Sequence, residues 1–316
     1  MEKHSWNGHA SMLGANTMWG LMSPISKLVM ASSVVTPFVV TELRVGGAML
    51  LFWLASLFQK PERVAPRDLL SLLGASLIAI VLNQGCFIFG VSLSTPGDAS
   101  IITTSMPLWA LVLAALILKE KITGKKLLGI AAGAGGALLL ILCSSNGSAP
   151  AGSTSVPATA PSTALWGDLL VLLAQLCYAL YIVLYKNFVT RYSLITLMKW
   201  MFTFSFLCTL PFTAGDLLAV PWASLPLPDI WGLLFIVICG TFLSYMLIVI
   251  GQKNLRPTVA GMYNYIQPLV ACLVAISLGL DTFSPAKGLA VALIFGGVYL
   301  VTRSSAEPHS EPDAIA

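Results

Sequence analysis

Four charged side chains interrupt stretches of sequence that are otherwise apolar: Lys27, Glu42, Arg44 and Lys199. At the centre of a membrane helix such a residue costs about 2.5–3.5 kcal/mol, so each is a functional candidate by default. The four could act as gate charges or bind the charged ends of a ligand, and the alternatives are static pairing and snorkelling. We expect Glu42 to pair with Lys27 or Arg44, and Lys199 to lie near the opposite mouth. Glu42 also makes proton coupling an option.

Two prolines predict helix kinks deep inside apolar stretches. Pro107 and Pro268 each free the backbone carbonyl four residues earlier, which belongs to Thr103 and Asn264 respectively. Irregular polar backbone at membrane depth is tolerated only inside protein or beside a water-filled cavity. The pair therefore predicts the centre of a binding site, and two packed kinks with satisfied hydroxyls are the alternative.

Amides and aromatic rings recur at helical spacing. Asn16 and Trp19 share one helix face, and Gln175 and Tyr178 repeat the pattern later in the chain. A polar stripe on a membrane helix should face the bundle, where amides either bind a ligand or join helices at roughly 0.6–2 kcal/mol each. The predicted substrate-binding residues are Asn16, Trp19, Asn83, Gln84, Thr103, Gln175, Tyr178, Tyr263, Asn264 and Gln267.

Composition requires a bilayer around these residues. Only 9% of the residues are charged, 57% are hydrophobic, and the mean hydropathy is +0.87. A soluble chain of this length carries charge on about a quarter of its positions. The net charge of +4 is distributed over short, separated loops, which does not fit a nucleic-acid surface.

Enzyme chemistry has no motif in this sequence. All three histidines fall in the polar ends of the chain, and the six cysteines lie singly in apolar stretches. The sequence contains no H-E-x-x-H motif, no G-x-S-x-G motif and no paired membrane aspartates. We therefore expect no catalytic residues, no metal and no cofactor.

Ten apolar stretches are long enough to cross a hydrocarbon core as helices. They are Ala10–Met30, Phe38–Phe58, Leu69–Leu93, Gly97–Leu118, Lys126–Cys143, Leu165–Tyr185, Leu194–Thr213, Ile230–Gln252, Thr258–Leu280 and Ala286–Thr302. Lys and Arg recur in every second loop, and the loops between them carry none. Because basic loops stay in the cytoplasm, both termini are predicted to be cytoplasmic.

The two halves of the sequence resemble each other. A shift of 161 positions places Pro107 on Pro268 and Gly136 on Gly297. Each half holds five helices, an odd number, so the second half must enter the membrane in the opposite sense. The sequence thus predicts an all-α integral membrane fold of ten transmembrane helices in two inverted five-helix repeats, residues 1–143 and 165–303. Residues 144–164 are predicted to be an external low-complexity linker, and residues 304–316 a disordered cytoplasmic tail.

Several of these motifs resemble a known family. The run W-G-L-M-S-P-I-S-K from Trp19 to Lys27, E-L-R-V-G-G-A from Glu42 to Ala48, and L-K-E-K-I-T-G-K-K-L-L-G from Leu118 to Gly129 resemble an EamA domain. The resemblance covers nearly the whole chain and implies the ten-helix branch of the drug/metabolite transporter (DMT) superfamily. Members commonly export amino acids and other small metabolites, and the second half departs from the pattern at Tyr178-Ala179 and Met198-Lys199-Trp200.

Symmetry and resemblance together predict a secondary transporter. Two oppositely oriented repeats can expose a shared pocket first to one side and then to the other. We expect export of amino acids or similar zwitterions across the plasma (inner) membrane, with a bacterial source. The alternatives are export of anionic, nucleobase-like or drug-like compounds and, from another class, an intramembrane enzyme or a channel. The expected partners are a small-molecule solute and the lipid bilayer, with no nucleic acid.

Overall fold

The structure is a computed structural model that describes residues 2–31, 34–117, 124–146, 161–185, 188, 191–254, 263–282 and 284–304. All regular structure in these residues is helical. The first half contains α1 (Glu2–Ala31), α2 (Pro37–Leu57), α3 (Pro66–Ser76), η1 (Leu77–Leu82), α4 (Asn83–Leu93), α5 (Pro96–Thr103), α6 (Met106–Ile117) and α7 (Gly124–Asn146). The second half contains α8 (Pro161–Tyr185), α9 (Leu194–Ala219), η2 (Trp222–Ser224), α10 (Leu227–Leu234), η3 (Phe235–Leu243), α11 (Ser244–Asn254), η4 (Tyr263–Tyr265), α13 (Ile266–Ser277) and α14 (Pro285–Ser304).

Consecutive elements join into the ten segments that the sequence predicts. The helices α3, η1 and α4 follow one another without a break, as do α10, η3 and α11, and α5 leads into α6. Six of the described segments are long and apolar enough to cross a membrane, and shorter apolar helices occur within α7, α13 and α14. The predicted all-helical fold is confirmed. The largest differences from the expected boundaries are that α1 begins at Glu2 and α9 continues past Pro211 to Ala219. Helix α7 also continues to Asn146 and α8 begins at Pro161, both inside the expected linker of residues 144–164.

Local sequence explains where several helices begin. Thr36 precedes Pro37, and its hydroxyl accepts a hydrogen bond from the Val39 N–H at 3.3 Å. Thr95 and Pro96 begin α5 in the same way. A capping hydroxyl satisfies an orphan N–H of the first turn, and proline is tolerated there because that N–H has no helical partner. These signals fix helix entry at one face of the bundle.

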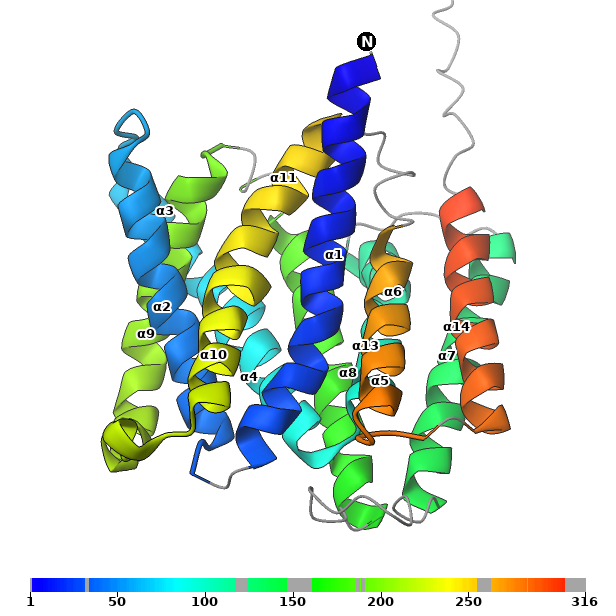
Figure 1. The fold of residues 1–316 in the computed structure, drawn as a ribbon. Coiled ribbons are helices and arrows are strands. Elements are labelled where there is room, and N and C mark those ends of the chain that lie inside the picture. Colours follow the sequence, from blue (N-terminus) through cyan, green and yellow to red (C-terminus); the bar gives the residue numbers. More distant parts are fainter. Residues whose placement is uncertain are drawn as a thin grey trace, which may run out of the picture.

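The two halves run in opposite senses through the bundle. In Figure 1, α1 (blue) begins at the top and runs downward, whereas α8 (green) begins at the bottom and runs upward. We call the face where α1 ends and α2 begins the lower face, and the opposite one the upper face. Helices α5, α8, α10 and α14 also begin at the lower face, which the charge pattern predicts to be external.

Glycines allow the closest contacts between the repeats. A Cβ on Gly297 of α14 would lie 2.5 Å from the Gly129 carbonyl oxygen of α7, and one on Gly136 would lie 2.9 Å from the Ala290 oxygen. Backbones can approach this closely only where side chains are absent, as in small-residue interfaces of membrane helices. Helix α7 ends the first repeat and α14 ends the second, so this contact joins the two.

The predicted proline breaks are present in the described residues. Helix α5 ends at Thr103 and α6 begins at Met106, immediately before Pro107. In the second repeat the 3-10 turn η4 precedes α13, which contains Pro268. The first part of the expected ninth span lies outside the described residues. Both breaks have the common cause expected from sequence, the hydrogen bond that each proline cannot donate.

Candidate functional site

Two π-helical segments lie at symmetric positions in the repeats. The segments η1 and η3 interrupt the third and eighth spans, and a shift of 161 positions places Leu77–Leu82 of η1 on Ile238–Leu243 of η3. π-helical turns are rare and concentrate at functional sites. Sequence reasoning missed both, because η1 has neither proline nor glycine to signal it.

The residues that follow the π-helical segments meet at the centre of the bundle. Gln84, which is 1% exposed, donates a hydrogen bond through Nε2 to the Tyr245 hydroxyl at 3.4 Å. The same shift of 161 positions places Gln84 on Tyr245, so the two are equivalent residues of the two repeats. Gln84 was predicted as a binding residue, whereas Tyr245 was missed although the repeat itself could have found it.

Aromatic rings surround this central contact. Trp19 meets Tyr245 edge to face with ring centroids 5.9 Å apart, and Phe202 meets it at 6.1 Å. Tyr178 stacks on Tyr181 at 6.0 Å, and both hydroxyls lie within electrostatic range of Tyr245. The predicted aromatics Trp19 and Tyr178 therefore converge on one place, from α1 and α8. We call Trp19, Arg44, Gln84, Tyr178 and Tyr245 the central cluster.

Arg44 supplies the charge of the central cluster. Its side chain is 4% exposed, and Nε donates to the Thr241 hydroxyl of η3 at 2.9 Å. Its Nη1 atom has no hydrogen-bond partner among the described residues, and neither does the Gln84 Oε1 atom. A buried polar atom without a partner costs about 1–3 kcal/mol, and more when charged. The centre therefore holds one donor and one acceptor that nothing within the described residues satisfies.

Three of the other predicted polar residues, Asn16, Asn83 and Gln267, join helices. Gln267 Nε2 donates to Asn16 Oδ1 at 2.7 Å, which connects α13 to α1, and Asn83 Nδ2 donates to the Ala174 carbonyl at 2.7 Å. Thr103 donates to the Ser100 carbonyl of its own helix at 2.7 Å. Gln175 is buried in α8 and Asn264 is half-buried in η4. Asn16 lies one turn from Trp19, so its bond to Gln267 borders the central cluster.

His9 lies in the polar end of the chain, as expected, and α1 extends far enough to include it. Its Nδ1 atom lies 2.6 Å from the Tyr263 hydroxyl, and the two form a hydrogen bond across the repeats. The predicted residue Tyr263 thus has a partner that the sequence did not indicate. The side chains of His4 and His309 lie outside the described residues.

The expected pairing of Glu42 with Lys27 or Arg44 was wrong within the described residues. Lys27 Nζ instead donates to the carbonyls of Ser92 and Ser94, at 2.7 and 2.8 Å. These carbonyls end α4, where a cation is stabilised by the unpaired C=O groups and the helix dipole. Glu42 and Arg44 lie two positions apart on α2 and therefore point away from each other.

Lys199 lies against an aromatic ring on the outside of the bundle. Its ammonium is 4.8 Å from the centroid of Trp53, whose indole N–H donates to Thr203 at 2.9 Å. Trp53 is 38% exposed, which places this pair at the lipid-facing surface between α2 and α9. Its role as a gate stays a prediction, and the geometry is that of a cation–π contact.

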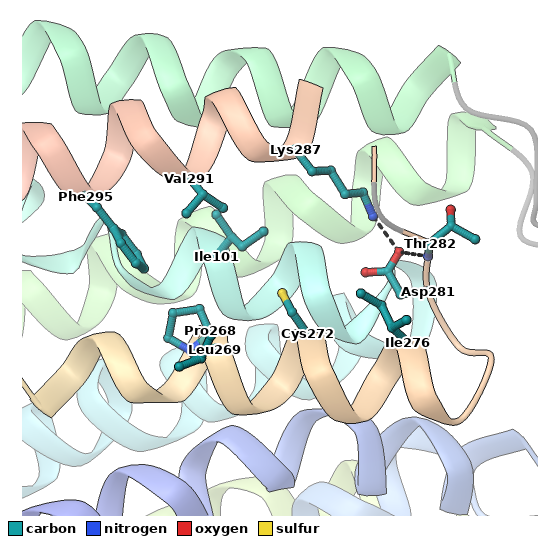
Figure 2. Close-up of a pocket in the computed structure, with 10 residues that line it drawn as sticks. All are labelled: Ile101, Pro268, Leu269, Cys272, Ile276, Asp281, Thr282, Lys287, Val291 and Phe295. Carbon is teal, nitrogen blue, oxygen red and sulfur yellow. Dashed lines mark hydrogen bonds and ion pairs between the residues drawn. The ribbon is translucent and has the colours of Figure 1, made fainter. Parts of the chain in front are cut away.

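A buried ionic cluster joins the repeats at the lower face. Lys287 Nζ lies 2.9 Å from Asp98 Oδ1 and 2.5 Å from Asp281 Oδ1, as Figure 2 shows for the second contact. Asp98 lies in the first turn of α5 in the first repeat, whereas Asp281 and Lys287 flank the start of α14 in the second. Thr95 also donates to Asp281 Oδ2 at 3.2 Å. We call Asp98, Asp281 and Lys287 the lower ionic cluster.

This cluster was missed because its members have separate local explanations. Asp98 has the place of a first-turn acid of a helix, and Lys287 has that of an interfacial residue, and neither role requires a partner. Gly97 makes the contact possible, since a Cβ there would lie 2.0 Å from Asp281 Oδ2. A cavity of about 150 Å³ extends beside it along α13, past Cys272, to Pro268 (Figure 2). The cluster therefore closes the lower end of a gap between repeats.

The structure offers no site for metal chemistry in the part of the chain that it describes. No group of three or more His, Cys, Asp or Glu side chains there could hold a metal ion. The polar groups of the central cluster are a guanidinium, an amide and phenols, which bind a solute without requiring a reaction. The arrangement brings polar and aromatic side chains of the two repeats together at one place.

Comparison with known proteins gives the family. The profile of the EamA-like transporter family matches residues 6–142 and 165–303, one match for each repeat. The chain belongs to the EamA-like transporter family. This EamA transporter, a member of the DMT superfamily, is therefore an integral membrane protein of several spans and not an enzyme.

Three relatives of the EamA transporter are described as uncharacterized transporters. YetK of Bacillus subtilis is 23% identical over 314 residues, covering 99% of this chain and 92% of its own. A transporter of Archaeoglobus fulgidus is 24% identical over 293 residues, covering 91% and 95%. YyaM of Bacillus subtilis is 25% identical over 217 residues, covering 67% of each. A solved crystal structure covers 98% of this chain and 99% of its own with a TM-score of 0.55 at 18% identity, which supports the fold alone.

Proposed function

We propose that this EamA transporter exports small zwitterionic solutes, with amino acids as the first candidates, by alternating access. The observation that carries the solute chemistry is the buried Arg44 guanidinium, whose Nη1 atom has no partner among the described residues. A carboxylate would satisfy it, because charge-assisted hydrogen bonds between Arg and carboxylate are the strong ones. Gln84 Oε1, also without a partner, would accept from an ammonium group.

The aromatic rings of the central cluster suit the rest of such a solute. Trp19 and Tyr245 meet edge to face, and Tyr178 lies next to them on α8. Aromatic faces attract an ammonium group and also pack against apolar side chains, so they tolerate solutes of different side-chain chemistry. The direction, export, comes only from the family resemblance and requires a direct measurement.

An anionic or nucleobase-like solute is the second candidate. Arg44 alone would bind the anion, and the stacked rings of Tyr178 and Tyr181 would suit a flat heterocycle. The two candidates differ at Gln84, because only an ammonium-bearing solute needs the amide oxygen as an acceptor. The variant Gln84→Leu should weaken a zwitterion strongly and a simple anion little.

Contacts between the repeats at both faces are consistent with alternating access. The lower ionic cluster joins α5 to α14, while at the upper face the Tyr192 hydroxyl donates to Asp68 at 2.6 Å. These contacts connect the first repeat to the second, so a rocking motion of one repeat against the other must break one set while it preserves the other. The order of breaking would decide which face the central cluster meets.

Counterflow in proteoliposomes tests this proposal. Vesicles preloaded with an unlabelled solute take up the same labelled solute through a carrier, whereas a channel shows neither saturation nor counterflow and an enzyme leaves an altered product. The panel should include amino acids, their decarboxylated amines, simple carboxylates and nucleobases. We expect saturable counterflow of amino acids, and no response to the amines that lack the carboxylate.

The variant Arg44→Gln tests the residue that carries the argument. Loss of a charge-assisted hydrogen bond of about 1.5–3 kcal/mol should weaken the apparent affinity by roughly ten- to a hundredfold. Lys60→Gln, which removes an exposed cation at the upper face, is the matched control and should transport normally. Equal amino-acid affinity in Arg44→Gln and the parent protein would contradict the proposed solute chemistry.

A further inference from the structure

A separate cavity of about 580 Å³ lies between α2, α9 and the segment formed by α10 and η3, toward the lower face. Its walls are apolar and include Phe206, Trp222, Leu233 and Val237. Ligand sites in proteins have volumes of about 300–1,000 Å³ and mostly apolar walls with a few placed polar groups. The size and lining of this cavity therefore suit a small organic molecule.

Glu42 is the charged residue of this lining among the described residues. Its side chain is 1% exposed, and neither carboxylate oxygen has a hydrogen-bond partner there. The hydroxyls of Thr209 and Thr213 are polar groups beside this carboxyl group, but each also lies within hydrogen-bond distance of a backbone carbonyl of α9, Ser205 at 2.9 Å and Thr209 at 3.1 Å, and a hydroxyl donates to one acceptor at a time. A buried carboxylate in apolar surroundings is costly without a partner. The cavity thus contains one buried acidic group that has no cationic partner among the described residues.

The cavity opens sideways, toward the lipid. Leu50 is 60% exposed, and Trp222 and Leu234 are each 43% exposed, and all three belong to the lining. An exposed apolar rim of this kind on a membrane protein suits contact with the hydrocarbon region. An occupant would therefore enter from the bilayer and would need an apolar body.

This cavity is distinct from the central cluster. Arg44, two positions after Glu42, points to Thr241 and is not part of the lining. The lining residues within the described part of the chain include no lysine or arginine, so an anionic or zwitterionic group would have no cationic partner there. Charge complementarity selects a cation.

We propose that this cavity binds an amphipathic amine, with its ammonium group against Glu42 and its alkyl or aryl body along the apolar walls. A neutral acyl chain would leave the carboxylate unsatisfied, and a phospholipid would bring a phosphate without a partner. An ammonium group satisfies Glu42 with a charge-assisted hydrogen bond. The site does not depend on the solute proposed for the central cluster.

Fluorescence quenching by a brominated alkylamine tests the site. Trp222 lines the cavity, whereas Trp231 is 64% exposed and is not part of the lining. In phosphatidylcholine nanodiscs, the amine should quench the parent protein saturably. The variant Trp222→Phe should remove the saturable part, and Trp231→Phe should retain it. A brominated alcohol of equal chain length is the neutral control, which should quench without saturation.

The variant Glu42→Gln should reduce amine affinity at least tenfold and leave quenching by the alcohol unchanged. Size-exclusion chromatography and a melting curve show whether Glu42→Gln folds. If it does not fold, a competition experiment in the parent protein tests the site instead. There, unbrominated amine should displace the brominated amine, and unbrominated alcohol should not. If amine and alcohol quench equally and quenching does not depend on Glu42, lipid chains fill the cavity. If only phosphatidylethanolamine displaces the brominated amine, the cavity binds a lipid headgroup. Either result overturns the proposal.

Discussion

Replacing Lys287 with Met should open the lower face of the transporter. Lys287 holds two buried carboxylates, Asp98 at 2.9 Å and Asp281 at 2.5 Å, and the three side chains are 16%, 2% and 5% exposed. Removing one partner of a buried pair costs about 3–5 kcal/mol, since the remaining charges stay buried. Separation of the repeats would let both carboxylates hydrate. Lys287 is partly exposed, so we take a value below this range. The equilibrium constant between the closed and open forms should shift roughly a hundredfold toward the open form, or about 2.7 kcal/mol.

Cys272 can report this change. It lines the small cavity beside the lower ionic cluster, and a protein with the other five cysteines replaced by serine retains it as the single thiol. A membrane-impermeant maleimide, added from the side of the lower face, should label Cys272 in Lys287→Met up to a hundredfold faster than in the parent. Loss of the Lys287 cation by itself disfavours the Cys272 thiolate and slows labelling. Faster labelling would therefore mean that the maleimide reaches Cys272 more easily.

Two further variants make the labelling experiment decisive. Lys287→Arg keeps the charge and should label at close to the parent rate. Asp98→Asn removes one of the two ion pairs but leaves Lys287 paired with Asp281, so its labelling rate should be intermediate. A folded Lys287→Met protein whose Cys272 is labelled at the parent rate would refute the idea that the cluster holds the lower face closed.

Three other predictions concern packing, pH and the lipid-facing lysine. Gly297→Leu should destabilise the protein by several kcal/mol, measured as a lower melting temperature, because its Cβ would lie 2.5 Å from the Gly129 oxygen. Burial tends to raise the pKa of Glu62, but hydrogen bonds with Ser193 and Thr196 at the start of α9 lower it overall. The ionised form of Glu62 should therefore stabilise the fold at pH values above the ordinary carboxyl pKa. That stability should disappear as the pH falls through the lowered pKa, and the acid-side loss in melting temperature should be smaller in Glu62→Gln. Lys199→Met should reduce stability modestly, because about 0.5–1 kcal/mol of cation–π energy with Trp53 is lost. If the folded variant instead loses most of its counterflow, the predicted role of Lys199 as a gate would be supported.

The spans could be predicted from the sequence because bilayer thickness and hydropathy constrain them strongly. Helix boundaries near Pro37, Pro66, Pro96 and Pro285 agree closely with the structure, since proline at a first turn is a local signal. The polar extension of α1 to Glu2 has no such signal, because hydropathy cannot show that a polar segment continues a helix. The contact between His9 and Tyr263 could not be predicted for this reason.

The site could be predicted only in part. Trp19, Gln84 and Tyr178, which the structure brings together, could be predicted as candidates because polar and aromatic residues on apolar helices stand out. Their partner Tyr245 belongs to no motif in the sequence, and only its position one repeat away from Gln84 distinguishes it. The lower ionic cluster depends on long-range contacts that no local pattern shows, since Asp98 and Lys287 come from different repeats.

The contact between Gln84 and Tyr245 has a consequence for the direction of transport. Its two members are equivalent residues of the two repeats, so an exchange of repeat conformations would return the contact to itself at an unchanged depth. A solute held beside it would travel similar distances to either bulk phase. The scaffold would then favour neither inward nor outward movement, and the sign of the net flux would follow from the gradients that the cell maintains.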